Sequence, residues 1–325
     1  MRAAIVTSYG DPVNGIELAE IAELPRTGPG EVLVEMDFAP INPADILFLR
    51  GCYATKPTLP SFIGIEGVGT VASVGPGVSH LSVGDRVAPR LSSNTWRERL
   101  LLPASAVTAL NNSADLMQLS MVTVNPVTAS LLLSEFKPLH RGAWILQNAA
   151  NSGVGRSVIM QARDRGLHTV NLVRRPEHIR ELEALGADVV IQDGPDVVER
   201  IRSALAGVDV CLALDCLSGE ATGVLASAIS YGAVIVSFGA LTSGPMILAP
   251  SDVIYKALTL KSFYVGRPEY AQKVPDLIKA SSDHVASGKL HVPIHSAFPL
   301  AEIKAAVAAA MNGGKIILDL RGVSS

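Results

Sequence analysis

A short turn between two predicted elements carries the clearest chemical signal in this chain of 325 residues. The segment 150–155 (ANSGVG) is a degenerate form of G-x-G-x-x-G, in which Ala150 and Ser152 replace the first two glycines and Gly155 keeps the third. An apolar run of strand length precedes it, and apolar residues recur behind it at helical spacing. A phosphate at this turn would face the unpaired amides of a helix N-terminus, where the helix dipole is positive. The turn therefore predicts a nucleotide site.

Two arginines, Arg174 and Arg175, follow the next predicted strand and indicate which nucleotide binds. That strand, 169–173, is expected to end beside the adenosine ribose, where NAD-preferring folds usually place an Asp or Glu. A guanidinium suits a ribose 2′-phosphate, whereas a carboxylate would repel it. The arginine pair predicts NADPH; the alternative is that both side chains belong to a solvated loop.

The elements that must position this site change in type along the chain. The first third has short β-like runs separated by turns rich in Gly and Pro, which is typical of a compact all-β unit. Helical spacing appears over 115–135, and strands then alternate with helices, which predicts a parallel, doubly wound sheet. Its six strands are expected at 143–149, 169–173, 189–192, 208–214, 233–238 and 258–265.

The length suits two domains that share a ligand cleft. We expect a β-rich domain from 1–115 with 290–325, and a nucleotide-binding domain from 116–289. The last strand, at 315–320, is expected to return to the first domain.

Composition and charge limit the function classes. Hydrophobic residues make up 48% and charged residues 18%, as in a globular protein, and the net charge of -3 disfavours nucleic acid and anionic membranes as partners. No apolar run is long enough to cross a bilayer, and the N-terminus lacks the profile of a signal peptide. The three cysteines are too few for a disulfide framework, so we expect free buried thiols and a cytoplasmic protein.

Metal chemistry is the next question, because an all-β domain followed by a dinucleotide fold also describes the zinc alcohol dehydrogenases. A catalytic zinc needs three ligands from Cys, His or carboxylates. The segment 63–69 resembles their G-H-E-G-x-G signature with Ile65 at the histidine position, and Asn42 stands where they have a cysteine. We therefore expect no bound metal.

The whole chain resembles the medium-chain dehydrogenase/reductase superfamily, in its zinc-free branch of quinone reductases and 2-enoyl thioester reductases. Segments 42–45 (NPAD), 51–53 (GCY), 75–78 (GPGV), 83–87 (VGDRV) and 315–318 (KIIL) carry this resemblance. Segments 95–98 (TWRE), 125–129 (NPVTA) and 147–155 (QNAANSGVG) look most like the enoyl thioester reductases. The resemblance implies a GroES-like β-rich catalytic domain and a Rossmann-type NADPH-binding domain.

Site residues follow from the resemblance at matching positions. Tyr53 matches a tyrosine near the substrate carbonyl that assists protonation, and it would share the substrate pocket with Ile65 and Trp96. The implied cofactor-binding residues are Asn42, Asn125, Thr128, Asn151, Ser152, Gly153, Val154, Arg174, Arg175, Phe238, Gly239, Ala240, Leu241, Phe263, Tyr264, Val265 and Lys315.

The chemistry of enoyl reduction is consistent with a tyrosine in that role. Addition of hydride to the β-carbon of an enoyl thioester builds an enolate, so the site needs a donor near the thioester oxygen and a proton for the α-carbon. A neutral Tyr53 can donate that hydrogen bond. Three alternatives stay open here: Tyr53 as a loop tyrosine that packs between the domains, Asn42 and Asp45 as turn residues that bond their own backbone, and Trp96 as an anchor at the domain interface.

We therefore predict an NADPH-dependent reductase of the C=C bond of an enoyl thioester, carried by CoA or acyl carrier protein. One alternative is NADPH:quinone reduction, and another is an NADPH-binding sensor without activity. The resemblance also implies a homodimer through the sheet edge near 258–265, where an open apolar edge would otherwise remain.

Overall fold

The chain forms two compact units in the computed structural model, which describes residues 1–53, 55–242 and 244–322. Unit 1 comprises Met1–Val124 and Glu269–Ser325, and unit 2 comprises Asn125–Pro268. Unit 1 therefore extends beyond the expected boundaries at 115/116 and 289/290, because it also includes residues 116–124 and 269–289. The reason is packing: helix α2 (Leu116–Leu119) lies against strands β3 and β5, and helix α9 (Val274–Ala286) lies against β8 and α2.

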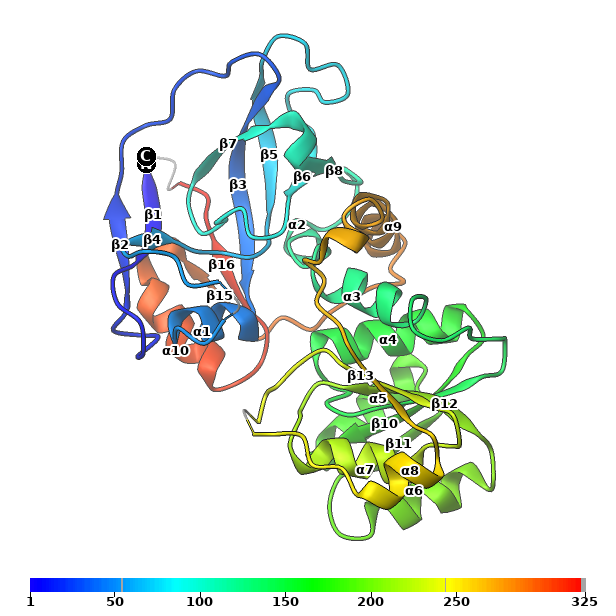
Figure 1. The fold of residues 1–325 in the computed structure, drawn as a ribbon. Helices are drawn as coiled ribbons and strands as arrows, with labels where there is room; N and C mark the ends of the chain where they lie inside the picture. The colour runs from blue at the N-terminus through cyan, green and yellow to red at the C-terminus, as the bar shows by residue number, and fades with distance from the viewer. Residues whose placement is uncertain (54, 243, 323–325) are drawn as a thin grey trace. The chain divides into compact units, whose positions relative to one another are not determined.

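Unit 1 is β-rich, as the sequence predicts. Its seven-stranded sheet has the order β15-β16-β3-β5-β6-β8, with β7 paired to β3, and a second sheet has the order β2-β1-β4 (Figure 1). The strands are β1 (Arg2–Val6), β2 (Ile16–Glu20), β3 (Glu31–Ile41), β4 (Ser61–Phe62), β5 (Val68–Val74), β6 (Arg86–Pro89), β7 (Arg99–Pro103), β8 (Val107–Ala109), β15 (Ser296–Pro299) and β16 (Ile316–Asp319). Helices α1 (Pro43–Leu49) and α10 (Ile303–Met311) complete this unit with α2 and α9. Because β16 pairs with β3, the predicted return of the last strand is confirmed.

Unit 2 is a doubly wound parallel sheet of order β11-β10-β9-β12-β13-β14, which confirms the predicted fold class. The strands are β9 (Trp144–Gln147), β10 (His168–Val173), β11 (Val189–Gln192), β12 (Val210–Asp215), β13 (Val234–Ser237) and β14 (Thr259–Ser262). The helices are α3 (Asn125–Leu132), α4 (Gly153–Asp164), α5 (Ile179–Leu185), α6 (Val197–Leu205), α7 (Glu220–Ala228) and α8 (Pro250–Tyr255). The strand order reverses between β9 and β12, the place where such sheets bind their ligands.

Two expectations need correction. The helical spacing over 115–135 belongs to two helices, α2 and α3, because Pro126 lacks an N–H and fits the first turn of a helix but not its interior. All three cysteines are free, but Cys52 is exposed and only Cys216 is fully buried. No helix in the described part of the chain is long and apolar enough to cross a membrane.

Candidate functional site

The predicted phosphate turn is the start of helix α4 in unit 2. Ser152 caps the helix, and its Oγ accepts the N–H of Gly155 at 3.1 Å. The N–H groups of Gly153 and Val154 donate to nothing within the described residues, so they are available to an anion. Gly155 must be glycine, because a Cβ there would lie 2.5 Å from the Ala150 carbonyl oxygen.

The side chain of Asn125 borders this turn. A Cβ on Gly153 would overlap the Asn125 amide, so the two residues fit only because position 153 is glycine. Asn125 is 7% exposed, and its Nδ2 atom has no hydrogen-bond partner among the described residues. Thr128 lies one turn later on α3 and is also buried. An orphaned buried donor beside a free helix N-terminus fits the phosphate and ribose oxygens of a dinucleotide.

The arginine pair lies at the carboxyl end of β10. Arg174 and Arg175 are both exposed, and neither forms a salt bridge with any described residue. A third arginine, Arg156, was not anticipated from the sequence: its Nη2 pairs with Glu181 Oε1 at 2.6 Å, and its Nε donates to the Asn151 carbonyl at 3.1 Å. The hydrogen bond from Arg156 lowers the pKa of Glu181. Arg156 therefore braces the turn, while the exposed pair is free to meet a 2′-phosphate.

A second polar group spans β9 and β12, where the strand order reverses. Asn148 Nδ2 donates to Asp215 Oδ1 at 2.7 Å, and Asn148 Oδ1 accepts the N–H of Cys216 at 2.8 Å. Asp215 also accepts the Thr222 hydroxyl at 2.6 Å. Sequence reasoning missed this group, because Asn148 and Asp215 meet only when β9 and β12 become neighbours in the sheet.

The segment Phe238–Leu241 follows β13 and rests on this group. The N–H of Phe238 donates to the Asp215 carbonyl at 2.9 Å, and the N–H of Leu241 donates to the Cys216 carbonyl at 3.3 Å. Gly239 approaches so closely that a Cβ would lie 2.6 Å from the Cys216 oxygen. Burial raises the pKa of the Cys216 thiol to about 12, so this cysteine has a packing role. Ala240 and Leu241 are exposed.

Three further predicted cofactor residues follow β14. Phe263 is 7% exposed, and its ring packs edge-on against Phe136 with centroids 6.0 Å apart. Tyr264 is exposed and Val265 is half-buried. The structure thus places the residues expected after β9, β10, β13 and β14 at one end of the sheet, because parallel strands all finish there.

Unit 1 holds a buried polar centre around Asn42. Its Nδ2 donates to Glu66 Oε1 at 2.8 Å, and its Oδ1 accepts Lys315 Nζ at 2.8 Å. The second Glu66 oxygen accepts the N–H of Val124 at 2.8 Å. Asp45 accepts the N–H of Asn42 at 2.9 Å, so Asp45 bonds nearby backbone, whereas the Asn42 side chain bonds two other side chains.

Burial dominates the electrostatics of this centre. It raises the pKa of Asp45 to about 7 and raises the pKa of Glu66, while it lowers the pKa of Lys315. The attraction between the Lys315 ammonium and the two carboxylates opposes each shift. Asn42 stands at a zinc-ligand position of the alcohol dehydrogenases, yet here its amide joins an ammonium to a carboxylate. Among the described residues, no group of three His, Cys, Asp or Glu side chains is placed to hold a metal ion.

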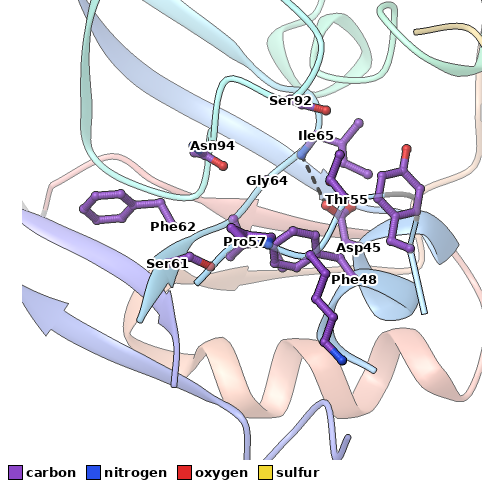
Figure 2. Close-up of a pocket in the computed structure, with 13 residues that line it drawn as sticks. Asp45, Phe48, Thr55, Pro57, Ser61, Phe62, Gly64, Ile65, Ser92 and Asn94 are labelled. Atoms are coloured by element: carbon purple, nitrogen blue, oxygen red, sulfur yellow. Dashed lines mark hydrogen bonds between the residues drawn. The ribbon is translucent and has the colours of Figure 1, made fainter. Parts of the chain in front are cut away.

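Beside this centre, unit 1 has a cavity of about 650 Å³. Tyr53 and Ile65 line it together with Asp45, Phe48 and Phe62. Figure 2 shows Phe62 and Ser61 on one side of the cavity and Ile65 and Asp45 on the other, with the Ile65 N–H donating to Asp45. The walls combine apolar side chains with polar ones, among them Lys56 and Asn94, so the cavity could hold a ligand that has both apolar and polar parts.

Trp96 does not line this cavity. It is fully buried in the core of unit 1, beneath Gly64, where a Cβ would lie 2.6 Å from the indole. Gly64 lines the cavity with φ +117, so Trp96 supports the wall from behind. Of the three predicted pocket residues, the structure brings Tyr53 and Ile65 to one cavity and leaves Trp96 in the core.

Comparisons with known proteins agree with this architecture. A family model described as the alcohol dehydrogenase GroES-like domain matches residues 28–100, and one described as zinc-binding dehydrogenase matches 153–280. The mitochondrial enoyl-[acyl-carrier-protein] reductase of Caenorhabditis elegans is 35% identical over 280 residues, which cover 85% of this chain and 80% of the relative.

Solved structures extend the likeness over the full chain. A complex of the 2-enoyl thioester reductase of Candida tropicalis with NADP and crotonyl-CoA has a TM-score of 0.86 at 25% identity, covering 98% of this chain and 99% of that one. A mycobacterial quinone oxidoreductase has a TM-score of 0.82 at 25% identity, with the same coverage of 98% and 99%. The chain therefore belongs to the medium-chain dehydrogenase/reductase superfamily, in the branch of the 2-enoyl thioester reductases and quinone reductases.

Proposed function

We propose that this protein is an NADPH-dependent oxidoreductase that reduces the C=C bond of a 2-enoyl thioester. The observation that carries the proposal is the unit 1 cavity of about 650 Å³, which Tyr53 lines together with the apolar side chains of Phe48 and Phe62. Such a volume accommodates an acyl chain and its thioester. The relatives named enoyl reductases, and the related complex with crotonyl-CoA, support this substrate class.

The cofactor-binding residues lie at the carboxyl ends of the unit 2 strands. The N–H groups of Gly153 and Val154 would meet the pyrophosphate, Asn125 would donate its orphaned amide, and Arg174 with Arg175 would hold the 2′-phosphate. NADPH, when bound, supplies the hydride for the β-carbon. The other proposed contacts are Asn42, Thr128, Asn151, Ser152, Phe238, Gly239, Ala240, Leu241, Phe263, Tyr264, Val265 and Lys315.

Tyr53 is the proposed hydrogen-bond and proton donor. As negative charge develops on the thioester oxygen, the tyrosine hydroxyl stabilises it and assists protonation of the α-carbon. The apolar side chains of Phe48, Phe62 and Ile65 line the same cavity and would lie against an acyl chain bound beside Tyr53.

Turnover by the purified protein tests this role directly. NADPH oxidation is expected with crotonyl-CoA, and Tyr53→Phe should lower kcat by about 10²-fold. Tyr231→Phe is the matched control, because Tyr231 is 78% exposed and lies in unit 2. A Tyr53→Phe variant with the wild-type rate would show that this hydroxyl takes no part in the reaction.

Quinone reduction is the second candidate, favoured by the likeness to the mycobacterial quinone oxidoreductase. A quinone accepts hydride without a dedicated proton donor at carbon, so its turnover should survive Tyr53→Phe. Naphthoquinone activity that exceeds enoyl-CoA activity would favour this reading. NADPH binding without turnover of either class would instead indicate a sensor.

The cofactor preference has its own test. Replacement of both Arg174 and Arg175 by Ala should lower the preference for NADPH over NADH by at least about tenfold, because the 2′-phosphate loses its charged donors. Arg200→Ala, in the exposed part of α6, is the control. An unchanged preference would assign the two arginines to a solvated loop.

We also propose a homodimer through the edge of the unit 2 sheet. All four residues of β14 are exposed, and Leu260 is 46% exposed at this open edge. The neighbouring helix α8 adds Ile254 and Tyr255, which are 68% and 78% exposed. An open strand edge beside these exposed apolar side chains favours pairing with a second copy, and the related Candida tropicalis enzyme is a heterodimer.

Sedimentation analysis tests the dimer. Leu260→Lys combined with Ile254→Lys should convert a dimer to a monomer, whereas Val83→Lys in unit 1 should not. A wild-type protein that sediments as a monomer would exclude it.

A cytoplasmic location is part of the same proposal. The C. elegans relative is named as mitochondrial, so the mitochondrion is the alternative compartment. Fractionation of the source cells distinguishes the two compartments.

A further inference from the structure

The Asp215 carboxylate is unusual among the buried acids of this chain. It is fully buried, and its four hydrogen-bond donors are all neutral: Asn148 Nδ2, the N–H groups of Leu217 and Ser218, and the Thr222 hydroxyl. Within the described residues, it forms no salt bridge. Glu66 and Asp45 also form no salt bridge among the described residues, but the Lys315 ammonium attracts both carboxylates and is joined to Glu66 through the Asn42 amide. A buried charge without a counter-charge is costly, even when hydrogen bonds satisfy its oxygens.

The position of Asp215 indicates what could compensate that charge. It is the last residue of β12, at the carboxyl end of the sheet, and its hydrogen bond to Asn148 spans the point where the strand order reverses. It pairs in register with Ser237 of β13, so it lies directly beneath the segment that begins at Phe238. Ligands of doubly wound sheets bind at this crevice.

We propose that the Asp215 carboxylate is an electrostatic determinant of the cofactor site, which stabilises the positive charge that a nicotinamide ring carries after it has given up hydride. This inference rests on the proposed function, because it requires the nicotinamide half of the cofactor at the carboxyl ends of β12 and β13. Transfer of hydride removes two electrons and one proton from the ring, which then carries one positive charge. A fixed negative charge in a water-poor site favours that state and the transition state that leads to it.

The hydrogen bonds around Asp215 allow a substitution that removes its charge and keeps its hydrogen-bonded partners. Asp215 Oδ1 accepts three N–H groups, and Oδ2 accepts only the Thr222 hydroxyl. In Asp215→Asn the amide oxygen can accept the same three donors, while its NH2 group donates to the Thr222 oxygen. The variant therefore keeps every hydrogen-bonded pair and removes only the charge.

The experiment compares the Kd values of NADP+ and NADPH for the whole protein, by calorimetry and by nucleotide fluorescence. In Asp215→Asn, the ratio Kd(NADP+)/Kd(NADPH) should rise by at least about threefold. A well-folded variant with the wild-type ratio would overturn the inference. Asp215→Ser, a smaller neutral side chain, reports the same loss of charge if Asp215→Asn does not fold.

Two control variants separate charge at this position from other effects. Asp188→Asn removes a carboxylate that pairs with His168 at the amino end of β10, and it should leave the ratio unchanged. Thr222→Val removes one hydrogen bond without changing the charge, so it should lower stability but keep the ratio. A ratio that shifts equally in the controls would overturn the inference.

Failure of the proposed function is distinguishable from failure of this inference. A wild type that binds neither nucleotide overturns both. A wild type that binds and turns over NADPH, with an unchanged ratio in both neutral Asp215 variants, overturns the inference alone.

Discussion

Both units of this protein contain buried carboxylates, but the groups that stabilise these carboxylates differ between the two units. In unit 1, Glu66 and Asp45 lie near the Lys315 ammonium, with Asn42 as a bridge. In unit 2, Asp215 has only neutral donors around it. The unit 1 carboxylates have a cation of the same chain near them, whereas the unit 2 carboxylate has only neutral partners and lies at the end of the sheet where doubly wound folds bind ligands.

Among the substitutions considered, loss of the Lys315 ammonium in unit 1 should destabilise the protein most. Lys315→Met leaves Glu66 and Asp45 without a counter-charge and should lower the free energy of unfolding by about 3–5 kcal/mol. Urea denaturation measures it. The double variant Glu66→Gln with Lys315→Met should be less destabilised than the sum of the single variants. Simple additivity would mean that the two groups do not interact.

In unit 2, the neutral bridge is expected to matter less. Asn148→Leu removes a donor from Asp215 and an acceptor from Cys216, and it should lower the free energy of unfolding by about 2–3 kcal/mol. Gln192→Leu is the matched control, since Gln192 is an exposed amide in the same unit. A cost as large as that of Lys315→Met would remove the distinction between the two centres.

The titration of Asp45 should appear in the pH dependence of stability. Burial raises the pKa of Asp45 to about 7 from its usual value of 3.8, so the folded state keeps a proton that the unfolded state releases at lower pH. Its contribution to stability is full below pH 3.8 and is lost as the pH rises to about 7. The wild type should therefore lose roughly 4 kcal/mol relative to Asp45→Asn across this window.

Urea denaturation of both proteins at several pH values gives this difference. A difference that does not change with pH would show that the carboxyl stays ionised in the fold.

The smallest expected effect compares one hydroxyl in each unit. Thr222→Val removes a hydrogen bond to Asp215 and should lower the free energy of unfolding by about 1.5 kcal/mol. Thr70→Val removes a hydrogen bond to Asp37, a carboxylate also stabilised by Arg321, and should cost about 0.5 kcal/mol. Thermal unfolding of both variants measures the difference. If Thr70→Val destabilised the protein more than Thr222→Val, the view that Asp215 depends on neutral donors alone would be contradicted.

Local sequence patterns were sufficient to predict most helices and strands and part of the candidate site. The turn at 150–155 and the arginines at 174 and 175 lie next to each other in the fold because a strand, a turn and a helix connect them directly. The helical spacing over 115–135 is divided between α2 and α3, because spacing alone does not show that a new helix begins near Pro126. The proposed roles of Tyr53 and the cofactor residues stay predictions.

The sequence by itself determined the two-part architecture, the phosphate turn and the positions where zinc ligands are replaced, because each depends on residues close together in the chain. Only the tertiary structure decided which distant groups meet: Lys315 with Asn42 and Asp215 with Asn148. It also decided that Trp96 lies in the core while Tyr53 lines a cavity. The physical reason is that burial and partner choice, which set the cost of each charge, depend on strand pairing across the sheets.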